Sequence, residues 1–261
     1  MLLSKLQTTN SSPIVYVANW YDEALCLNEL IGREIAIQFT GLLICKSCKK
    51  QTKKFFGEGF CFPCFNSSPE NSPCILRPEL CTAHLGTGRD PEWEEEHHNQ
   101  PHIVYLAATD SVKVGVTRAS QLPTRWIDQG ASSAIIFAET PNRYEAGKLE
   151  VELKEFYTDK TNFRKMLQNE IDESIDLIEE KWQTVEKLPS DLQEFISEND
   201  TITKLNYPIL TFPKSVQVLN LNKTPLISGV FLGIKGQYLL FENDFALNVR
   251  RHIGYDIELT F

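Results

Sequence analysis

Four cysteines in two pairs constrain the fold of this chain more than any other feature of its sequence. Cys45 and Cys48 form one CxxC pair, Cys61 and Cys64 form another, and twelve residues separate the pairs. Each CxxC turn can present two sulfurs to one ion, so the two turns together supply the four ligands of a tetrahedral zinc site. Because four cysteines leave no open coordination position, we expect this Zn²⁺ to be structural.

The remaining composition favours metal binding over a disulfide framework. The chain has 261 residues and seven cysteines, and its amino terminus lacks the apolar core of a secretory signal. Reducing compartments keep thiols available as ligands, so we expect a cytoplasmic protein that does not act at a membrane. Redox thiols or unpaired core cysteines are the alternatives for the two pairs, and a core position is what we expect for Cys26.

A second group of metal-binding residue types follows the first. Its cysteines and histidines could bind another zinc ion or an iron–sulfur cluster. Alternatively, the cysteines are small core residues and the histidines lie on a solvated loop. The candidate ligands of this second site are Cys74, Cys81, His84 and His98.

The segment between the two cysteine pairs is both basic and aromatic. It contains four lysines and three phenylalanines in twelve residues. Such a loop could contact nucleic acid, or it could be the solvated tip of a hairpin. The lysines proposed to bind nucleic acid are Lys49, Lys50, Lys53 and Lys54.

Residues 102–167 follow a compact pattern of strand, turn, strand, helix, strand and helix. In the second strand, three valines alternate with three other residues, so the two sets point to opposite faces of the sheet. We expect the valine face to be packed and the other face to be open. A glycine weakens a strand interior unless something must approach the backbone there. The residues of the face expected to be open are Lys113, Gly115 and Thr117.

Two charged side chains could meet above this open face. A short helix closed by Gly130 carries Arg125 and can fold back across the face. A planar guanidinium suits a phosphate or a carboxylate. Glu150 lies at the edge of the apolar stripe of a later helix, so its carboxylate can face the sheet. These residues together predict a phosphate-binding groove.

The order of these residues resembles the GIY-YIG nuclease core, a small β-β-α-β-α domain, over about residues 102–165. Two positions depart from the family pattern, because Lys113 replaces the tyrosine of the second motif and Gln129 replaces a histidine often found after the arginine. The whole chain also resembles an uncharacterised bacterial family that joins cysteine pairs to such a core. The matching positions are Ile103-Val104-Tyr105 for the first motif, Lys113-Val114-Gly115 followed by Thr117 for the second, Arg125 for the arginine and Glu150 for the metal-binding glutamate.

The GIY-YIG resemblance implies a metal-dependent endonuclease. Glu150 would hold Mg²⁺ or Mn²⁺, Arg125 would brace the phosphodiester, and Tyr105 would accept or orient a proton. Lys113 would lower the pKa of the nucleophile or bind phosphate, and Gly115 and Thr117 would contact the nucleic acid. The alternative is a non-enzymatic zinc-binding protein that retains the core for nucleic-acid binding or as an adaptor.

Charge adds a third hypothesis. The formal net charge is −9, which argues against general electrostatic capture of DNA or RNA. Residues 166–261 carry 8 basic and 15 acidic side chains, a net charge of −7. Apolar residues between Leu167 and Val185 recur every three or four positions and predict one long amphipathic helix with an acidic outer face. This acidic helix could bind a basic protein partner.

We therefore predict an α+β fold with five regions. The N-terminal strands could complete the C-terminal β domain, because both ends of the chain show strand patterns. The regions are an N-terminal β segment (1–42), a zinc-ribbon-like cysteine and histidine module (43–100), a GIY-YIG-like core (101–167), an acidic helical region (168–200) and a C-terminal antiparallel β domain (201–261).

Overall fold

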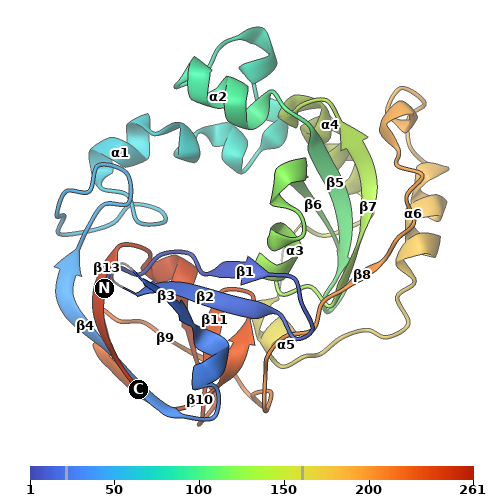
Figure 1. Cartoon of the computed structure of the whole chain (residues 1–261). Coiled ribbons are helices and arrows are strands. Elements are labelled where there is room, and N and C mark those ends of the chain that lie inside the picture. Colours follow the sequence, from blue (N-terminus) through green and yellow to red (C-terminus); the bar gives the residue numbers. More distant parts are fainter. Residues whose placement is uncertain (21–22, 160–161) are drawn as a thin grey trace.

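The protein has a mixed α+β fold, and its described residues form three sheets and few helices (Figure 1). The computed structural model describes residues 1–20, 23–159 and 162–261. Every helix is short, and none in the described part of the chain is long and apolar enough to cross a membrane. The α-helices are α1 (Phe62–Ser67), α2 (Pro91–His98), α3 (Thr124–Asp128), α4 (Arg143–Leu153), α5 (Phe163–Leu167) and α6 (Leu177–Val185). The 3-10 helices are η1 (Leu27–Leu30), η2 (Pro69–Asn71), η3 (Pro73–Ile75), η4 (Pro78–Leu80), η5 (Ala83–Leu85), η6 (Ala119–Gln121), η7 (Gln193–Phe195) and η8 (Val249–His252).

The largest sheet joins the two ends of the chain. Its strand order is β13-β4-β10-β11-β12-β9, and β4 pairs antiparallel with both β13 and β10. Ile35 and Ile37 of β4 are buried while their neighbours are more exposed, as the alternating sequence predicts. The strands are β4 (Glu34–Leu43), β9 (Gln217–Leu219), β10 (Leu226–Lys235), β11 (Tyr238–Phe241), β12 (Phe245–Asn248) and β13 (Tyr255–Thr260).

A three-stranded sheet packs on the same apolar core. Its antiparallel strands are β1 (Gln7–Thr9), β2 (Val15–Trp20) and β3 (Glu23–Cys26). Tyr16 of β2 is buried together with Ile37 of β4 and Phe231 of β10. The N-terminal strands therefore share one hydrophobic core with the C-terminal sheet.

The third sheet has the order β6-β5-β7-β8 and carries the predicted hairpin. Every residue of its inner strand β5 is buried, because both faces of that strand are covered. Tyr105 packs into the core of the N- and C-terminal strands, whereas Leu106 packs into a second core beneath α4 and α6. The strands are β5 (His102–Ala108), β6 (Val112–Arg118), β7 (Ser133–Thr140) and β8 (Thr203–Lys204).

The face of β6 that we expected to be open is instead mostly covered. The side chain of Lys113 is 3% exposed and Thr117 is 6% exposed. A Cβ atom on Gly115 would lie 2.5 Å from the hydroxyl oxygen of Tyr105. The expectation was wrong because the Tyr105 ring fills the space over Gly115, and Trp126 of α3 packs edge-on against that ring at 6.1 Å.

The single long acidic helix is also absent. Asn169, with φ of 58°, follows α5, and α6 starts only at Leu177. Asp176 caps α6 by accepting from the backbone N–H groups of Ile178 and Glu179 at 2.9 and 3.2 Å. Asp176, which the sequence pattern places on the outer face of one long helix, thus binds backbone amides and starts a new helix.

The cysteine module differs from a zinc ribbon in its second half. Cys61 is the residue before α1, and Cys64 lies in its first turn. Pro63 occupies the start of α1, where its fixed φ favours a helix. The second CxxC pair therefore lies at a helix start, while the first lies in a turn closed by a hydrogen bond from Lys49 N–H to Cys45 O.

Candidate functional site

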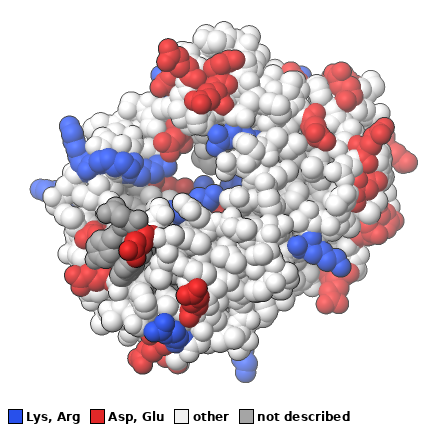
Figure 2. Space-filling model, viewed as in Figure 1, with Lys and Arg blue, Asp and Glu red and all other residues white. Residues whose placement is uncertain are grey.

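A cleft of about 590 Å³ opens between the cysteine module, the β5–β6 sheet and residues from both ends of the chain. Figure 2 shows this face hollowed, with Lys and Arg side chains around the hollow, whereas Asp and Glu side chains gather over the edge near α6. The cations that line the cleft are Lys5, Lys46, Arg118, Arg125, Arg143 and Arg250, and the carboxylates are Glu58, Glu70 and Asp128.

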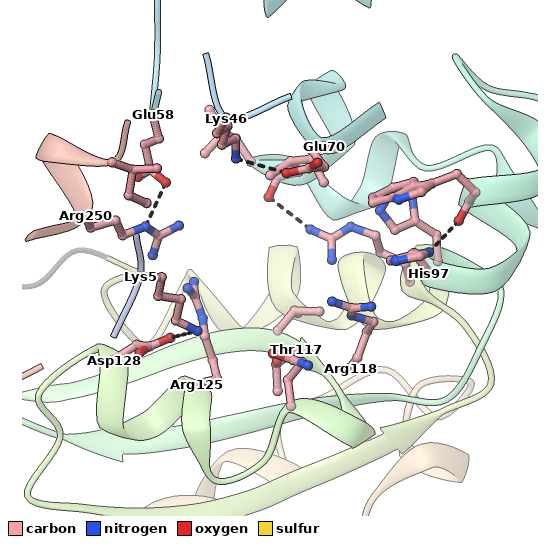
Figure 3. Close-up of a pocket in the computed structure, with 18 of the residues that line it drawn as sticks. Lys5, Lys46, Glu58, Glu70, His97, Thr117, Arg118, Arg125, Asp128 and Arg250 are labelled. Atoms are coloured by element: carbon pink, nitrogen blue, oxygen red, sulfur yellow. Dashed lines mark hydrogen bonds and ion pairs between the residues drawn. The ribbon is translucent and has the colours of Figure 1, made fainter. Parts of the chain in front are cut away.

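Three of these cations form ion pairs with carboxylates of the lining, and we call these the rim ion pairs (Figure 3). Each one joins a cation to one of the three carboxylates of the lining, so most of the charge at the rim is neutralised. The rim ion pairs are Lys5 with Asp128, Lys46 with Glu70 at 3.0 Å, and Arg250 with Glu58 at 2.8 Å.

The other three cations are Arg118, Arg125 and Arg143, which we call the inner arginines. Among the described residues, no carboxylate forms an ion pair with any of them, and Nε of Arg125 is buried without a hydrogen-bond partner. Burial lowers the pKa of Arg118 and of Arg143, so their positive charge is only partly solvated. The inner arginines make this part of the cleft a cationic wall.

Backbone contacts hold Arg143 in that wall. Its Nε donates to the carbonyl oxygen of Cys74 at 2.9 Å, and its terminal nitrogen donates to that of Ile75 at 3.0 Å. Both acceptors are neutral, so these two hydrogen bonds do not neutralise the charge of the guanidinium.

Only two of the predicted core residues, Thr117 and Arg125, line the cleft. Tyr105 is fully buried and donates from its hydroxyl to Oε1 of Gln129 at 2.8 Å. Burial raises the pKa of Tyr105 and lowers the pKa of Lys113, whose Nζ lies 3.5 Å from Asp110. A buried, protonated phenol orients its neighbours but is a poor proton acceptor at neutral pH.

Glu150 lies near the inner arginines but outside the cleft wall. It is 7% exposed, and its Oε2 is 3.2 Å from Nζ of Lys154 on the next turn of α4. Burial raises the pKa of Glu150, and the charge of Lys154 opposes this change. Burial is the main cause that raises the pKa of Tyr105, and the charge of Glu150 adds a smaller contribution in the same direction. The predicted guanidinium and carboxylate do not both line the cleft, because Arg125 is part of its wall and Glu150 is not.

The four predicted lysines of the cysteine module are exposed and lie outside the cleft. Lys46, just before them, does line the cleft. The loop therefore adds positive charge to the outer surface of the cysteine module and not to the cleft wall. The exposed side chains are Lys49, Lys50, Lys53 and Lys54.

The four paired cysteines cluster as a candidate metal site, as predicted. Their sulfur atoms all lie within 4.8 Å of one another, and Sγ of Cys48 is 3.8 Å from Sγ of Cys61. Zinc–sulfur bonds of about 2.3 Å place two corners of a tetrahedron about 3.8 Å apart, so the cluster fits Zn²⁺. Burial opposes ionisation of Cys45, but backbone N–H groups, that of Cys61 first, lower the pKa of its thiol to about 6.

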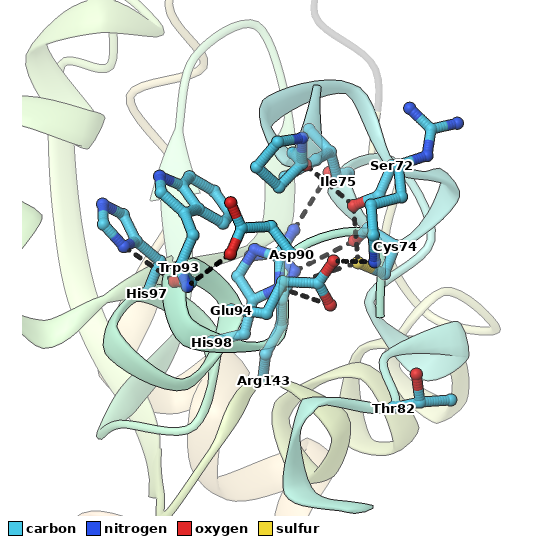
Figure 4. A network of polar contacts seen from close by, with 12 residues as sticks. Ser72, Cys74, Ile75, Thr82, Asp90, Trp93, Glu94, His97, His98 and Arg143 are labelled. Carbon is cyan, nitrogen blue, oxygen red and sulfur yellow. Dashed lines mark hydrogen bonds and ion pairs between the residues drawn. The ribbon is translucent and has the colours of Figure 1, made fainter. Parts of the chain in front are cut away.

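The second predicted metal cluster forms with three of its four members, and Figure 4 shows two of them, Cys74 and His98. The ligand atoms of Cys74, Cys81 and His98 lie within 4.8 Å of one another. His84 does not belong to this group and stacks on Tyr144 at 4.5 Å instead.

Most of the cations that line the cleft were not predicted from the sequence. One local signal was available, because Arg143 occupies the first turn of α4, where the helix dipole disfavours a cation. The rim cations gave no local signal, since Lys5 and Arg250 come from opposite ends of the chain. The missed lining cations are Lys5, Lys46, Arg118, Arg143 and Arg250.

Fold and site together define a mixed α+β protein with a candidate Cys₄ zinc site and a cationic cleft. The chain belongs to the family described as protein of unknown function (DUF2797), whose model matches residues 32–257. No curated protein and no solved structure matches the chain. The matched range includes both cysteine clusters and the three inner arginines.

Proposed function

We propose that the cleft binds the phosphates of a single-stranded nucleic acid. The observation that carries this proposal is the set of three inner arginines, which lack carboxylate partners among the described residues. A guanidinium presents donors in a planar fork that matches phosphate oxygens. Three such forks in one cleft suit a ligand with several negative charges.

Size and aromatic lining favour a single strand over a duplex. A volume of about 590 Å³ lies within the range of pockets that hold small molecules. Trp93 and His97 line the same cleft and stack on each other with ring centroids 4.0 Å apart. Because unpaired bases stack on aromatic side chains, phosphates would bind the arginines while a base binds at Trp93.

The test is binding of labelled single-stranded DNA and RNA, measured by fluorescence anisotropy over a range of salt concentrations. Arg118→Ala removes a charged hydrogen-bond donor, so affinity should fall about tenfold or more. The slope of log K against log salt should decrease by about 0.7 for each phosphate that the variant no longer neutralises. Arg164→Ala, an exposed arginine on α5 outside the cleft, is the matched control. Equal reductions in both variants would refute the cleft as the binding site.

Metal-dependent hydrolysis at the same site is the second candidate function. It agrees with the resemblance of Tyr105, Arg125 and Glu150 to the GIY-YIG core, and Glu150 offers a mostly buried carboxylate on α4 beside Lys154. Mg²⁺ is often bound through one or two carboxylates and keeps several waters. Glu150 could hold Mg²⁺ or Mn²⁺ by exchanging Lys154 for the ion, and the ion would supply Lewis-acid activation of the phosphodiester.

Cleavage and binding assays on one pair of variants separate the two functions. Glu150→Gln should retain binding and lose any Mn²⁺-dependent cleavage, because the amide is a much weaker metal ligand than a carboxylate. Glu152→Gln on the exposed face of α4 is the control. Binding without cleavage by the unmodified protein in Mg²⁺ and Mn²⁺ would reject hydrolysis and leave the binding function standing.

A further inference from the structure

The segment from Pro69 to Asp90 has little apolar core of its own. It contains four 3-10 helices and no strand. Its buried hydrophobic cluster consists of Cys74, Cys81 and Ala83, with Tyr144 of α4 packed against it. Two of the three buried members are cysteines, so the residues that hold this segment are also metal-ligand types.

We propose that Cys74, Cys81 and His98 bind a second Zn²⁺, and that this ion fixes Arg143 in the wall of the cleft. The two cysteines lie at η3 and after η4, and the histidine ends α2. One ion would therefore join two turns of the irregular segment to a helix.

The distances and burial fit this assignment. Sγ of Cys74 is 3.7 Å from Nδ1 of His98. Zn–S bonds of about 2.3 Å and Zn–N bonds of about 2.0 Å place these two ligand atoms about 3.5 Å apart in a tetrahedron. Cys74, Cys81 and His98 are only 5%, 2% and 3% exposed. Thiolate and imidazole ligands select zinc over hard cations such as Mg²⁺, and three protein ligands leave the fourth position for water.

The same cysteine connects the ion to the cleft. Cys74 contributes its sulfur to the cluster, while its carbonyl oxygen accepts from Nε of Arg143 at 2.9 Å. The next carbonyl, that of Ile75, accepts from the same guanidinium. Figure 4 shows Arg143 beneath Cys74 and Ile75. A metal ion that fixes the sulfur would therefore also fix the two carbonyl groups that orient Arg143. The effect of this on ligand binding rests on the proposed function of the cleft.

Metal content tests the ion itself. Purified full-length protein should contain two zinc ions per chain by elemental analysis, and the apo protein should take up two equivalents of Co²⁺ with thiolate charge-transfer absorption. Cys81→Ser should reduce the content to one ion, whereas Cys81→His should retain two because it restores a ligand. Cys26→Ser, outside both clusters, is the matched control and should retain two. One zinc per unmodified chain, and one equivalent of Co²⁺, would overturn the second site without relying on any variant.

Affinity for a single-stranded oligonucleotide tests the connection to Arg143. Arg143→Ala and Cys81→Ser should weaken binding by similar factors, about tenfold, and the double variant should bind no more weakly than either single variant. Loss of zinc from Cys81→Ser with unchanged affinity would overturn the connection. If the unmodified protein binds no oligonucleotide, the proposed function and the connection both fail, and the zinc content still decides the metal site.

Discussion

The cleft contains two kinds of cation that differ in what surrounds them. Each rim cation is neutralised by one carboxylate. Two of the rim ion pairs join parts of the chain that are distant in sequence, and the third joins two turns of the cysteine module. The inner arginines lie within one continuous stretch, residues 118–143, and none of them forms an ion pair with a described carboxylate; Arg143 donates to two neutral carbonyl oxygens. The difference indicates that rim charges position the regions around the cleft, whereas inner charges are available to a ligand.

Removing inner charge should have the largest effect. The double variant Arg118→Ala/Arg125→Ala should lose affinity for single-stranded nucleic acid by about 100-fold or more, because each charged hydrogen bond contributes about 1.5–3 kcal/mol. Anisotropy titrations check this loss, and urea unfolding of the same variant checks that it is folded. A folded double variant with affinity within threefold of the unmodified protein would remove the distinction between inner and rim cations.

The charge of the inner arginines should also affect how the stability of the protein depends on pH, through its effect on the pKa of His102. Burial first, and then the charges of Arg143 and other neighbours, lower the pKa of His102 to about 4. The unfolded chain binds this proton below about pH 6.5 while the folded protein does not, so stability is complete above pH 6.5 and is lost as the pH falls toward 4. The expected loss is about 2 kcal/mol between pH 6.5 and 5.

Urea unfolding at several pH values measures this loss. His102→Asn should remove that part of the pH dependence. Arg143→Met should reduce it, because one source of repulsion is gone, and Lys46→Met at the rim should leave it unchanged. An equal change from both substitutions would contradict the distinction.

A smaller effect should come from the contact that brings η4 against α4. A Cβ atom on Gly147 would lie 2.2 Å from the backbone nitrogen of Glu79, which cannot move like a side chain. Gly147→Ala should therefore destabilise the protein by about 1–3 kcal/mol, even though alanine gains about 1 kcal/mol in helix propensity. Thermal unfolding checks this result. Glu152→Ala on the same helix should change stability little, and a stabilised Gly147→Ala variant would show that the contact is loose.

The smallest effect should come from the rim. Arg250 and Glu58 have side chains that are 41% and 48% exposed, so their ion pair contributes about 0–1 kcal/mol. Arg250→Ala should change the affinity for single-stranded nucleic acid by less than about threefold, and Glu58→Ala should have an equally small effect. A tenfold loss in Arg250→Ala alone, measured in the same titrations, would place Arg250 with the inner arginines.

Local patterns in the sequence predicted the local structure well. The spacing of Cys45, Cys48, Cys61 and Cys64 predicted their cluster because each pair lies within one turn and the loop between them is short. The alternation in β4 predicted its half-buried face, and the hairpin, helix and strand after His102 occur in the expected order.

The remaining features depend on residues that meet only in the folded chain. Lys113 is buried because its face of the sheet turns toward a core that both chain ends help to form. The predicted acidic helix is interrupted because Asp176 binds backbone amides at the start of α6. The spacing of apolar residues does not show whether an aspartate caps a helix or lies within one. The cleft combines Lys5 and Arg250, which are 245 positions apart, so no sequence window contains both.

The position of β4 between β10 and β13 has a consequence for synthesis of the protein. This strand leaves the ribosome almost 200 residues before either of its partners, since β10 begins at Leu226 and β13 ends at Thr260. Until then the backbone donors and acceptors along its two edges lack their native strand partners, and strands in that state are prone to aggregate. The nascent chain therefore needs protection, from a chaperone or from transient pairing with β2 and β3, until its last strand is complete.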